Sequence, residues 1–346
     1  MTTRVAIVGS GNISRTHALA ARDMPGVAVT AHWSRNLAAA ETMAREFGGT
    51  AYDTLEECFA RGSIDVALIG TPSGVHADHA TIAVRHGVPV IVEKPLDTTT
   101  RRIDALLEEG ERRSVTIGVF FQDRTAPPLV WLKSVVASGA LGRLLLATAQ
   151  VKWYRSPAYY SSSSWRGTRA LDGGGALMNQ GTHTVDLLLW LAGDVDHVFA
   201  TTRAALHAIE VEDTAVACLE FANGAIGTIE ATTAAFPGFP RRLELTGSEG
   251  TAVIEGDRVT SVELHSGRLA PPAHDEDTSM RSTSPVISDI RGHRRIIEDF
   301  LTALAGTRRP VCDGREGRRS VALVEAIYES ARTQLRVPVD KADETR

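Results

Sequence analysis

Five short runs of apolar and β-branched residues alternate with longer helical stretches near the start of the chain, and this order constrains the fold most. The runs cover residues 4–8, 27–33, 64–70, 88–93 and 114–120. Such spacing is typical of parallel strands joined by helical crossovers. Ser73 and Gly87 are the expected caps of a helix over roughly residues 74–86. We therefore predict a doubly wound, Rossmann-type α/β domain over residues 1–122.

The pattern changes after Pro127 and Pro128. A helix is expected to end near Gly139, and a strand-like run follows at 144–154. From about residue 195 the strands follow one another without helices, and Asn223-Gly224 between two of them predicts a type I′ hairpin. We predict a second, α+β domain over residues 123–346 with a largely antiparallel open sheet. It includes a surface loop at 268–290 and helices at roughly 292–305 and 316–333.

Composition excludes several classes of protein. With 43% hydrophobic and 23% charged residues, the 346-residue chain is globular rather than disordered or fibrous. Its net charge of −5 provides no electrostatic reason to bind nucleic acid or an anionic membrane. The three distant cysteines indicate neither a disulfide framework nor a metal site, and we expect no metal. The apolar runs are too short to span a membrane and no leader is visible, so we expect a cytoplasmic protein.

A glycine-rich turn follows the first strand. Gly9 allows the tight turn into a helix, and the missing Cβ of Gly11 lets backbone N–H groups approach a pyrophosphate, with Asn12 and Ile13 beginning the helix. The third glycine of the usual fingerprint is replaced by Ser14. An ordinary turn is the alternative. Because the turn joins a first strand to a helix, we predict a dinucleotide site.

The end of the second strand bears on which dinucleotide binds. An NAD site normally has an acidic residue here that binds the ribose 2′-hydroxyl. This chain has Ser34 and Arg35, which could bind a 2′-phosphate instead. NADP is therefore favoured over NAD. The alternative is that Arg35 is a solvated arginine and NAD binds.

Two further loops follow strands of the predicted sheet. Glu93 and Lys94 end the fourth run, at the edge where open α/β sheets bind ligands. Lys94 could stabilise charge on a substrate oxygen, although a surface ion pair with Glu93 is an equal alternative on position alone. Thr71, Pro72 and His76 follow the third run and are assigned to the same cofactor crevice, where His76 is expected to cap or pack.

A polar stripe marks the second domain. At 100° per residue, Asn179, His183 and Asp186 fall on one helical face, whereas the leucines that follow face the core. Glycines 173–175 precede this helix and suit a close approach of a ligand or of another backbone. The alternative is a capped helix in which His183 is structural.

Together these residues resemble the glucose–fructose oxidoreductase, inositol dehydrogenase and rhizopine-catabolism family, called Gfo/Idh/MocA. The resemblance spans nearly the whole chain. Its segments, in order, are the GSGNIS turn followed by His17, TPSGVH, EKP, GGGALMNQGTHTVD and DGREGRRSVALVEAIYESA. It implies a Rossmann domain, a second domain whose open sheet often forms an oligomer interface, and pyridine-nucleotide redox chemistry on sugars or cyclitols.

By this resemblance Lys94 matches the family's catalytic lysine, His183 its general acid/base, and Asp186 an acid beside the histidine. Many members have Asp where this chain has Asn179, so His183 would transfer the proton without a second carboxylate. The NQG-x-H version is similar to a subgroup that acts on nucleotide-linked or amino sugars.

Candidate substrate contacts follow from the chemistry of sugar recognition. Aromatic faces suit sugar rings, and arginine forks suit carboxylate or phosphate groups. We assign Arg155, Tyr160 and Arg166 to substrate binding, together with Asn179.

The resulting hypothesis is an NAD(P)-dependent dehydrogenase of a sugar, nucleotide sugar or cyclitol, active as a homodimer or homotetramer. Imidazole can exchange the alcohol proton near neutral pH, while Lys94 binds the same oxygen. Two alternatives stay open: a glycosidase that oxidises its substrate transiently with NAD, and a non-catalytic nucleotide-binding regulator.

Overall fold

The computed structural model describes residues 2–273, 289–306 and 308–341. Within the chain two compact units are formed, and each is described by itself. The first unit combines residues 1–122 with 286–318, and the second combines 123–285 with 319–346. The expected boundary after residue 122 coincides with the first division. The described residues 289–306 and 308–318, which the sequence placed in the second domain, belong instead to the first unit. Most of the predicted loop at 268–290 lies outside the described residues.

The first unit has the predicted parallel sheet, in the order β3-β2-β1-β4-β5-β6. The strands are β1 (Thr3–Val8), β2 (Val27–Trp33), β3 (Thr50–Tyr52), β4 (Val66–Ile69), β5 (Val90–Val92) and β6 (Ile117–Val119). β3 is a three-residue strand that the sequence analysis missed. The helices are α1 (Asn12–Arg22), α2 (Leu37–Phe47), α3 (Leu55–Arg61), α4 (His76–Arg85), α5 (Thr100–Arg113) and α9 (Arg291–Ala305). The predicted Rossmann-type fold is confirmed.

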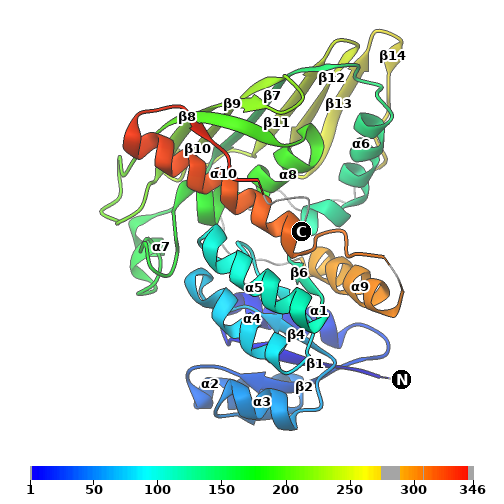
Figure 1. Cartoon of the computed structure of the whole chain (residues 1–346), viewed down its shortest axis with the longest axis vertical. Coiled ribbons are helices and arrows are strands. Elements are labelled where there is room, and N and C mark those ends of the chain that lie inside the picture. Colours follow the sequence, from blue (N-terminus) through cyan, green and yellow to red (C-terminus); the bar gives the residue numbers. More distant parts are fainter. Residues whose placement is uncertain (1, 274–288, 307, 342–346) are drawn as a thin grey trace. The chain divides into compact units, whose positions relative to one another are not determined.

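Helix α9 belongs to the first unit because its apolar side packs into that unit's core. Ile296, Ile297 and Phe300 are buried in the same cluster as Val5 and Ile7 of β1. α9 also packs beside α1 (Figure 1). Since these contacts join residues almost three hundred positions apart, no local pattern in the sequence reveals them.

The caps of α4 differ in part from the prediction. Ser73 begins a 3₁₀ turn, η1 (Ser73–Val75), and is not the N-cap of α4. The backbone N–H of Ala77 instead donates to the carboxylate of Asp97 at 3.0 Å. Gly87, just past the helix, has φ +75°, as a glycine that ends a helix commonly has.

The second unit contains a nine-stranded sheet in the order β14-β13-β12-β11-β7-β10-β9-β8-β15. Its neighbours are antiparallel except β7 and β10, which are parallel. The strands are β7 (Leu144–Lys152), β8 (Val195–Arg203), β9 (Thr214–Phe221), β10 (Ile226–Thr232), β11 (Arg242–Gly247), β12 (Gly250–Glu255), β13 (Arg258–Leu264), β14 (Gly267–Arg268) and β15 (Val337–Pro338). This confirms the predicted, largely antiparallel sheet.

The remaining helices are α6 (Pro127–Ala137), α7 (Pro157–Ser161), α8 (Thr182–Ala192) and α10 (Gly314–Thr333). The division between the two units falls within α10, after Arg318. Among the helices that the structure describes, none has both the length and the apolar character that crossing a membrane requires.

The hairpin at Asn223-Gly224 forms between β9 and β10 as predicted, but its turn is not type I′. A type I′ turn needs positive φ at both central residues. Only Gly224 has one (φ +84°), and its N–H donates to the carbonyl of Phe221 at 2.9 Å. This is the pattern of a three-residue loop that ends in a glycine bulge.

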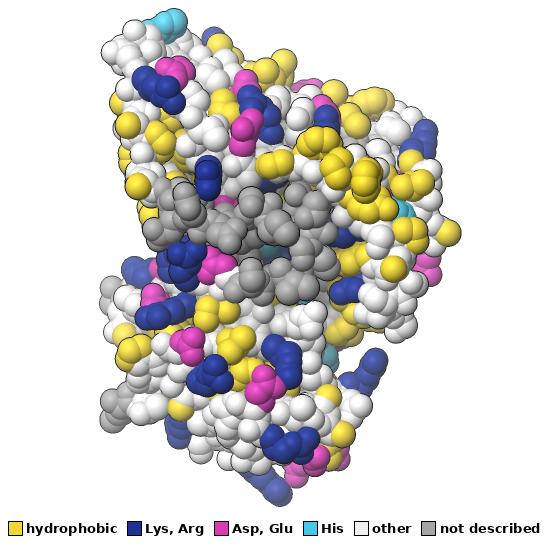
Figure 2. Space-filling model, turned by 180° about the vertical axis from the view of Figure 1, so that it is seen from behind, with side chains coloured by type: hydrophobic (Ala, Val, Ile, Leu, Met, Phe, Trp, Pro, Cys, Tyr) yellow, Lys and Arg dark blue, Asp and Glu magenta, His cyan; other side chains and the backbone are white. Residues whose placement is uncertain are grey.

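Several apolar side chains on one face of the second sheet are exposed. Leu146, Phe199, Val216 and Ile226 lie on this face and are 38–60% exposed. Figure 2 shows hydrophobic side chains gathered on the second unit's surface. Exposed apolar patches of this kind often mark interaction surfaces.

Candidate active site

The turn after β1 brings two backbones into close contact. Gly9 has φ +114°, and a Cβ there would lie 2.7 Å from the carbonyl oxygen of Gly70 and 2.6 Å from Ser14 Oγ. The Gly9 N–H donates to the carbonyl of Trp33 at 2.7 Å. A side chain at Gly9 would therefore separate β1 from the end of β4.

Gly11 differs, because a Cβ there would meet no atom within 4 Å. It is the N-cap of α1, with no side-chain cap and no acidic residue in the first turn, which begins with Asn12 and Ile13. The first N–H groups of α1 follow this open position and lie at the positive end of the helix dipole. These features fit the pyrophosphate of a dinucleotide.

The end of β2 has the polar character that the sequence predicts. Ser34 is buried, and its hydroxyl lies 2.9 Å from that of Ser10 in the glycine turn. Arg35 is exposed and forms no ion pair with any residue that the structure describes. No carboxylate occupies the position that usually binds a ribose 2′-hydroxyl.

His76 joins the two other loops of the crevice. Its Nδ1 lies 2.7 Å from the carbonyl oxygen of Pro95, and its Nε2 lies 2.7 Å from that of Thr71, which precedes Pro72. Each ring nitrogen of His76 thus lies within hydrogen-bond distance of a backbone carbonyl oxygen, one in each loop. The expectation that His76 packs rather than catalyses agrees with this geometry.

Glu93 and Lys94 follow β5, and Glu93 does not lie on the surface. Glu93 is 6% exposed, and its Oε2 accepts from the backbone N–H of Lys94 at 3.1 Å. Its Oε1 accepts from Nε2 of His17 at 2.9 Å. Lys94 itself is partly exposed, at the edge of the sheet where the glycine turn also lies.

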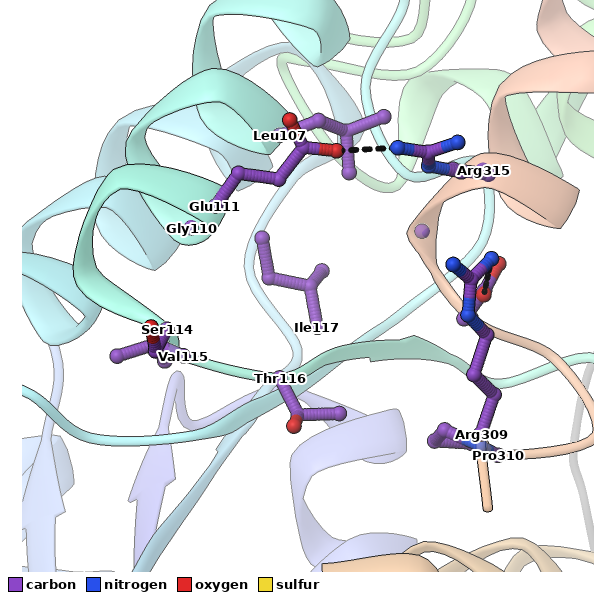
Figure 3. A pocket seen from close by; sticks show the side chains of 12 residues that line it. Leu107, Gly110, Glu111, Ser114, Val115, Thr116, Ile117, Arg309, Pro310 and Arg315 are labelled. Atoms are coloured by element: carbon purple, nitrogen blue, oxygen red, sulfur yellow. Dashed lines mark hydrogen bonds and ion pairs between the residues drawn. The ribbon is translucent and has the colours of Figure 1, made fainter. Parts of the chain in front are cut away.

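A pocket of about 230 Å³ in the first unit lies elsewhere (Figure 3). Its lining includes Leu107, Glu111, Ile117 and Arg315, and Arg315 pairs with Glu111 at 2.6 Å. Ile117 begins β6, so the pocket lies near the amino end of that strand. The predicted cofactor residues follow the carboxyl ends of the strands, and none of them lines this pocket.

In the second unit, the segment before α8 is not the continuous α-helix that the 100° spacing assumes. Residues Ala176–Gly181 form a π-helical turn, η3, and α8 begins only at Thr182. Such turns are often found at functional sites. Asn179 lies in η3, whereas His183 and Asp186 lie in α8.

Two of the glycines before η3 lie in close contact with other parts of the protein. A Cβ at Gly174 would lie 2.0 Å from Tyr328 Oη, and one at Gly175 would lie 2.1 Å from the carbonyl oxygen of Glu212. The Glu212 carboxylate accepts from Leu177 N–H and from Tyr328 Oη, each at 2.8 Å. Burial raises the pKa of Glu212 despite these donors.

The three polar residues of the predicted stripe have different surroundings. Asn179 donates to the buried carboxylate of Asp172 at 2.6 Å, and His183 is partly exposed. Asp186 is fully buried and accepts from Arg124 Nε at 2.9 Å and Nη2 at 2.7 Å. Both of its oxygens therefore bind one guanidinium, and its expected role as an acid beside His183 stays a prediction.

Two of the substrate candidates, Arg155 and Arg166, form a cluster with Tyr159 and Gln180, and we call these four residues the arginine–tyrosine cluster. The guanidinium carbon of Arg166 lies 4.3 Å from the centre of the Tyr159 ring, and that of Arg155 lies 5.6 Å from it. Gln180 accepts from Arg155 Nε at 3.0 Å and donates to Tyr159 Oη at 2.8 Å. Burial lowers the pKa of Arg155, and Arg166 adds to the effect.

Tyr160, chosen from the sequence for substrate binding, packs inside the unit instead. Its side chain is buried, its hydroxyl lies 2.7 Å from Thr233 Oγ1, and burial raises its pKa to about 12. Tyr159, which the choice omitted, contacts both arginines. The sequence contains both tyrosines side by side, and only the direction of each side chain distinguishes them.

We predict that Gly11→Ala weakens NADH binding at least about tenfold, because its methyl group would fill the space open to the pyrophosphate. The free energy of unfolding should change by less than about 0.5 kcal/mol, since nothing lies within 4 Å. Fluorescence titration and urea denaturation measure the two quantities.

Gly26→Ala is the matched control. A Cβ at Gly26 would also meet no atom within 4 Å, but Gly26 has φ +75°, which alanine adopts only with strain. The variant should therefore lose about 1 kcal/mol of stability, while its NADH affinity stays unchanged. Equal NADH affinity of Gly11→Ala and wild type would contradict the assignment.

Comparisons with known proteins agree with this geometry. Residues 3–121 match the model of the oxidoreductase family with an NAD-binding Rossmann fold, and residues 129–253 match the GFO/IDH/MocA C-terminal domain. Among curated proteins, the inositol 2-dehydrogenase of Rhizobium meliloti (strain 1021) is 25% identical, over 98% of this chain and 100% of that protein.

Two solved structures are similar over nearly the whole chain. The WlbA dehydrogenase from Bordetella pertussis, in complex with NADH and UDP-GlcNAcA, is 32% identical with a TM-score of 0.87, covering 99% of this chain and 98% of that one. Levoglucosan dehydrogenase in complex with NADH and levoglucosan is 25% identical with a TM-score of 0.87, covering 99% and 100%. The chain belongs to the GFO/IDH/MocA family of NAD-binding oxidoreductases.

Proposed function

We propose that this oxidoreductase oxidises a secondary alcohol of a sugar, nucleotide sugar or cyclitol, with His183 as general acid/base and Lys94 bound to the reacting oxygen. Two observations support this most. Gly11 borders open space at the same edge of the first sheet as Lys94, and His183 in the first turn of α8 is partly exposed. When bound, the nicotinamide ring accepts the hydride from the alcohol carbon.

In the proposed mechanism, the hydroxyl proton passes to the imidazole of His183 as the hydride leaves the carbon. The ammonium of Lys94 donates a hydrogen bond to the same oxygen and stabilises the charge that develops on it. The oxygen then forms the carbonyl, and the product is a ketone or a lactone. Asp186 takes no proton in this scheme, since Arg124 binds both of its oxygens.

The arginine–tyrosine cluster supports an acidic sugar as substrate. Arg166 donates to Ser162 and to the carbonyl of Tyr159, its Nε is buried without a hydrogen bond, and no described carboxylate pairs with it. A substrate carboxylate or phosphate would supply that negative charge. The similar Bordetella enzyme was solved in complex with UDP-GlcNAcA. We propose that the substrate of the present chain is also an acidic, nucleotide-linked sugar.

The exposed apolar face of the second sheet supports a homo-oligomer. Leu146, Phe199, Val216 and Ile226 would be covered by a second copy of the chain, as a homodimer or homotetramer. We place the protein in the cytoplasm, as its cysteine pattern indicates.

Replacement of His183 tests the reaction. We expect His183→Ala to lower kcat about a hundredfold to ten-thousandfold while NADH affinity stays within about twofold, because only proton transfer is lost. The exposed His265→Ala is the matched control. Unchanged kcat in His183→Ala would contradict the proposal and favour a regulator, and free sugar released without NADH accumulation would favour a glycosidase.

Arg166→Gln tests the substrate class. Loss of one charge-assisted hydrogen bond costs about 1.5–3 kcal/mol, so KM for a nucleotide-linked sugar acid should rise about tenfold to hundredfold. Neutral sugars should show no such change. Arg169→Gln, a nearby exposed arginine, is the control. Equal kcat/KM of wild type and Arg166→Gln on every acidic sugar tested would exclude the role of Arg166.

Cofactor preference is tested at the end of β2. The absence of an acid there, with exposed Arg35 beside Ser34, supports NADP, whereas both similar structures described above hold NADH. Arg35→Asp should shift the ratio of kcat/KM from NADP toward NAD, because the new carboxylate repels a 2′-phosphate. Identical ratios before and after the change would rule out Arg35 as the determinant.

A further inference from the structure

A buried cluster of two histidines and one glutamate lies directly beside Lys94 in the first unit. His17 of α1, Glu93 after β5 and His293 of α9 are 0%, 6% and 1% exposed. Glu93 Oε1 lies 2.9 Å from His17 Nε2 and 3.6 Å from His293 Nε2. We call these three residues the histidine–glutamate cluster.

The cluster has the composition of a metal site, since its three ligand atoms lie within 4.8 Å of one another. A metal-binding histidine almost always donates its second ring N–H to a polar partner. Here the Nδ1 atoms of His17 and His293 are buried, and neither has a hydrogen-bond partner among the described residues. The geometry therefore favours a hydrogen-bonded cluster over a metal site.

The lack of a hydrogen-bond partner at Nδ1 also indicates the tautomers of His17 and His293. An unpartnered ring nitrogen is less costly to bury as a bare acceptor than as an N–H group of a cation. The N–H of each ring is then at Nε2, the atom that faces Glu93. Burial lowers the pKa of His17, which agrees with a neutral ring. His17 also stacks on Phe120, with 4.2 Å between ring centres.

Glu93 remains ionised in this environment. Burial alone would raise its pKa, yet the hydrogen bond from His17 and the nearby imidazole of His293 hold the pKa well below its usual range. The second carboxylate oxygen accepts the backbone N–H of Lys94. One buried carboxylate thus connects the helix that follows the glycine turn, the backbone of Lys94, and α9.

We propose that His17 and His293 are positioning residues for Lys94. They hold the Glu93 carboxylate in one place and in its charged form, and Glu93 fixes the backbone of Lys94 relative to α1. Small displacements of a catalytic group reduce rates strongly: about 1 Å can cost a hundredfold. The inference rests on the proposed role of Lys94 in the reaction.

The structure suggests variants that separate position from packing. His293→Leu removes the N–H donor, whereas His293→Gln keeps a donor near the place of Nε2. Glu93→Gln removes the charge that both histidines bind. His86→Leu changes an exposed histidine of the same unit and is the control.

Lys94 can be observed without any turnover. The chain has four lysines, Lys94, Lys133, Lys152 and Lys341, so reductive methylation with ¹³C-formaldehyde gives few NMR signals. Loss of one signal in Lys94→Arg identifies Lys94. We expect His293→Leu and Glu93→Gln to move this signal toward the position of a solvated lysine, and His293→Gln and His86→Leu to leave it in place.

Kinetics give the second measurement. With the sugar acid that the wild type turns over fastest, kcat should fall about tenfold to hundredfold in His293→Leu and Glu93→Gln. NADH affinity should stay within about twofold, and His293→Gln should recover most of the rate. If no sugar is turned over, the proposed function fails, while the Lys94 signal still decides this inference.

Three results would overturn the inference. The first is an unchanged Lys94 signal in Glu93→Gln. The second is weaker NADH binding with unchanged kcat, which would place the cluster in cofactor binding. The third is one equivalent of tightly bound metal in the wild type, measured by mass spectrometry of the metal content, that His293→Leu loses.

Discussion

The parallel order of the first sheet is the constraint on which the proposed site depends. Because β1, β4 and β5 are adjacent and parallel, the turn at Gly9, the loop at Thr71 and the turn at Glu93 all follow strand ends at one edge. Gly9 lets the backbone of that turn contact Gly70 at the end of β4. His76 then bonds the second loop to the third. The crevice is thus built from backbone contacts and one histidine bridge.

In the second unit, buried charged and polar side chains hold α8 and η3 in place. Breaking a buried ion pair is costly because the remaining charge loses its partner. Arg124 with Asp186 fixes α8, and Glu212 with Tyr328 fixes the start of η3. His183 lies in the first turn of α8, between the segments that these two pairs hold. The two partners in each of these contacts are far apart in the sequence.

The local features were predictable from the sequence. The strands of the first sheet, the roles of Gly9 and Gly11 in the turn, and the hairpin at Gly224 follow from periodicity and from glycine's freedom. The three-residue β3 is too short to show a period, and the π-helical turn at 176–181 breaks the one assumed for the polar stripe. Long-range contacts were out of reach: the return of α9 to the first unit, and the partners of Glu93, depend on residues distant in the sequence. Tyr159 and Tyr160 are the same residue type, so the sequence could not show that Tyr160 is the buried one.

The central claim is that Lys94 and His183 act on the same oxygen, and a crystal structure of the enzyme with NADH and a bound sugar acid tests it most directly. The account predicts Lys94 Nζ and a ring nitrogen of His183 each within about 3.2 Å of one sugar oxygen, whose carbon faces the nicotinamide ring. A complex in which either side chain contacts a different part of the sugar, or points away from the nicotinamide, would contradict it.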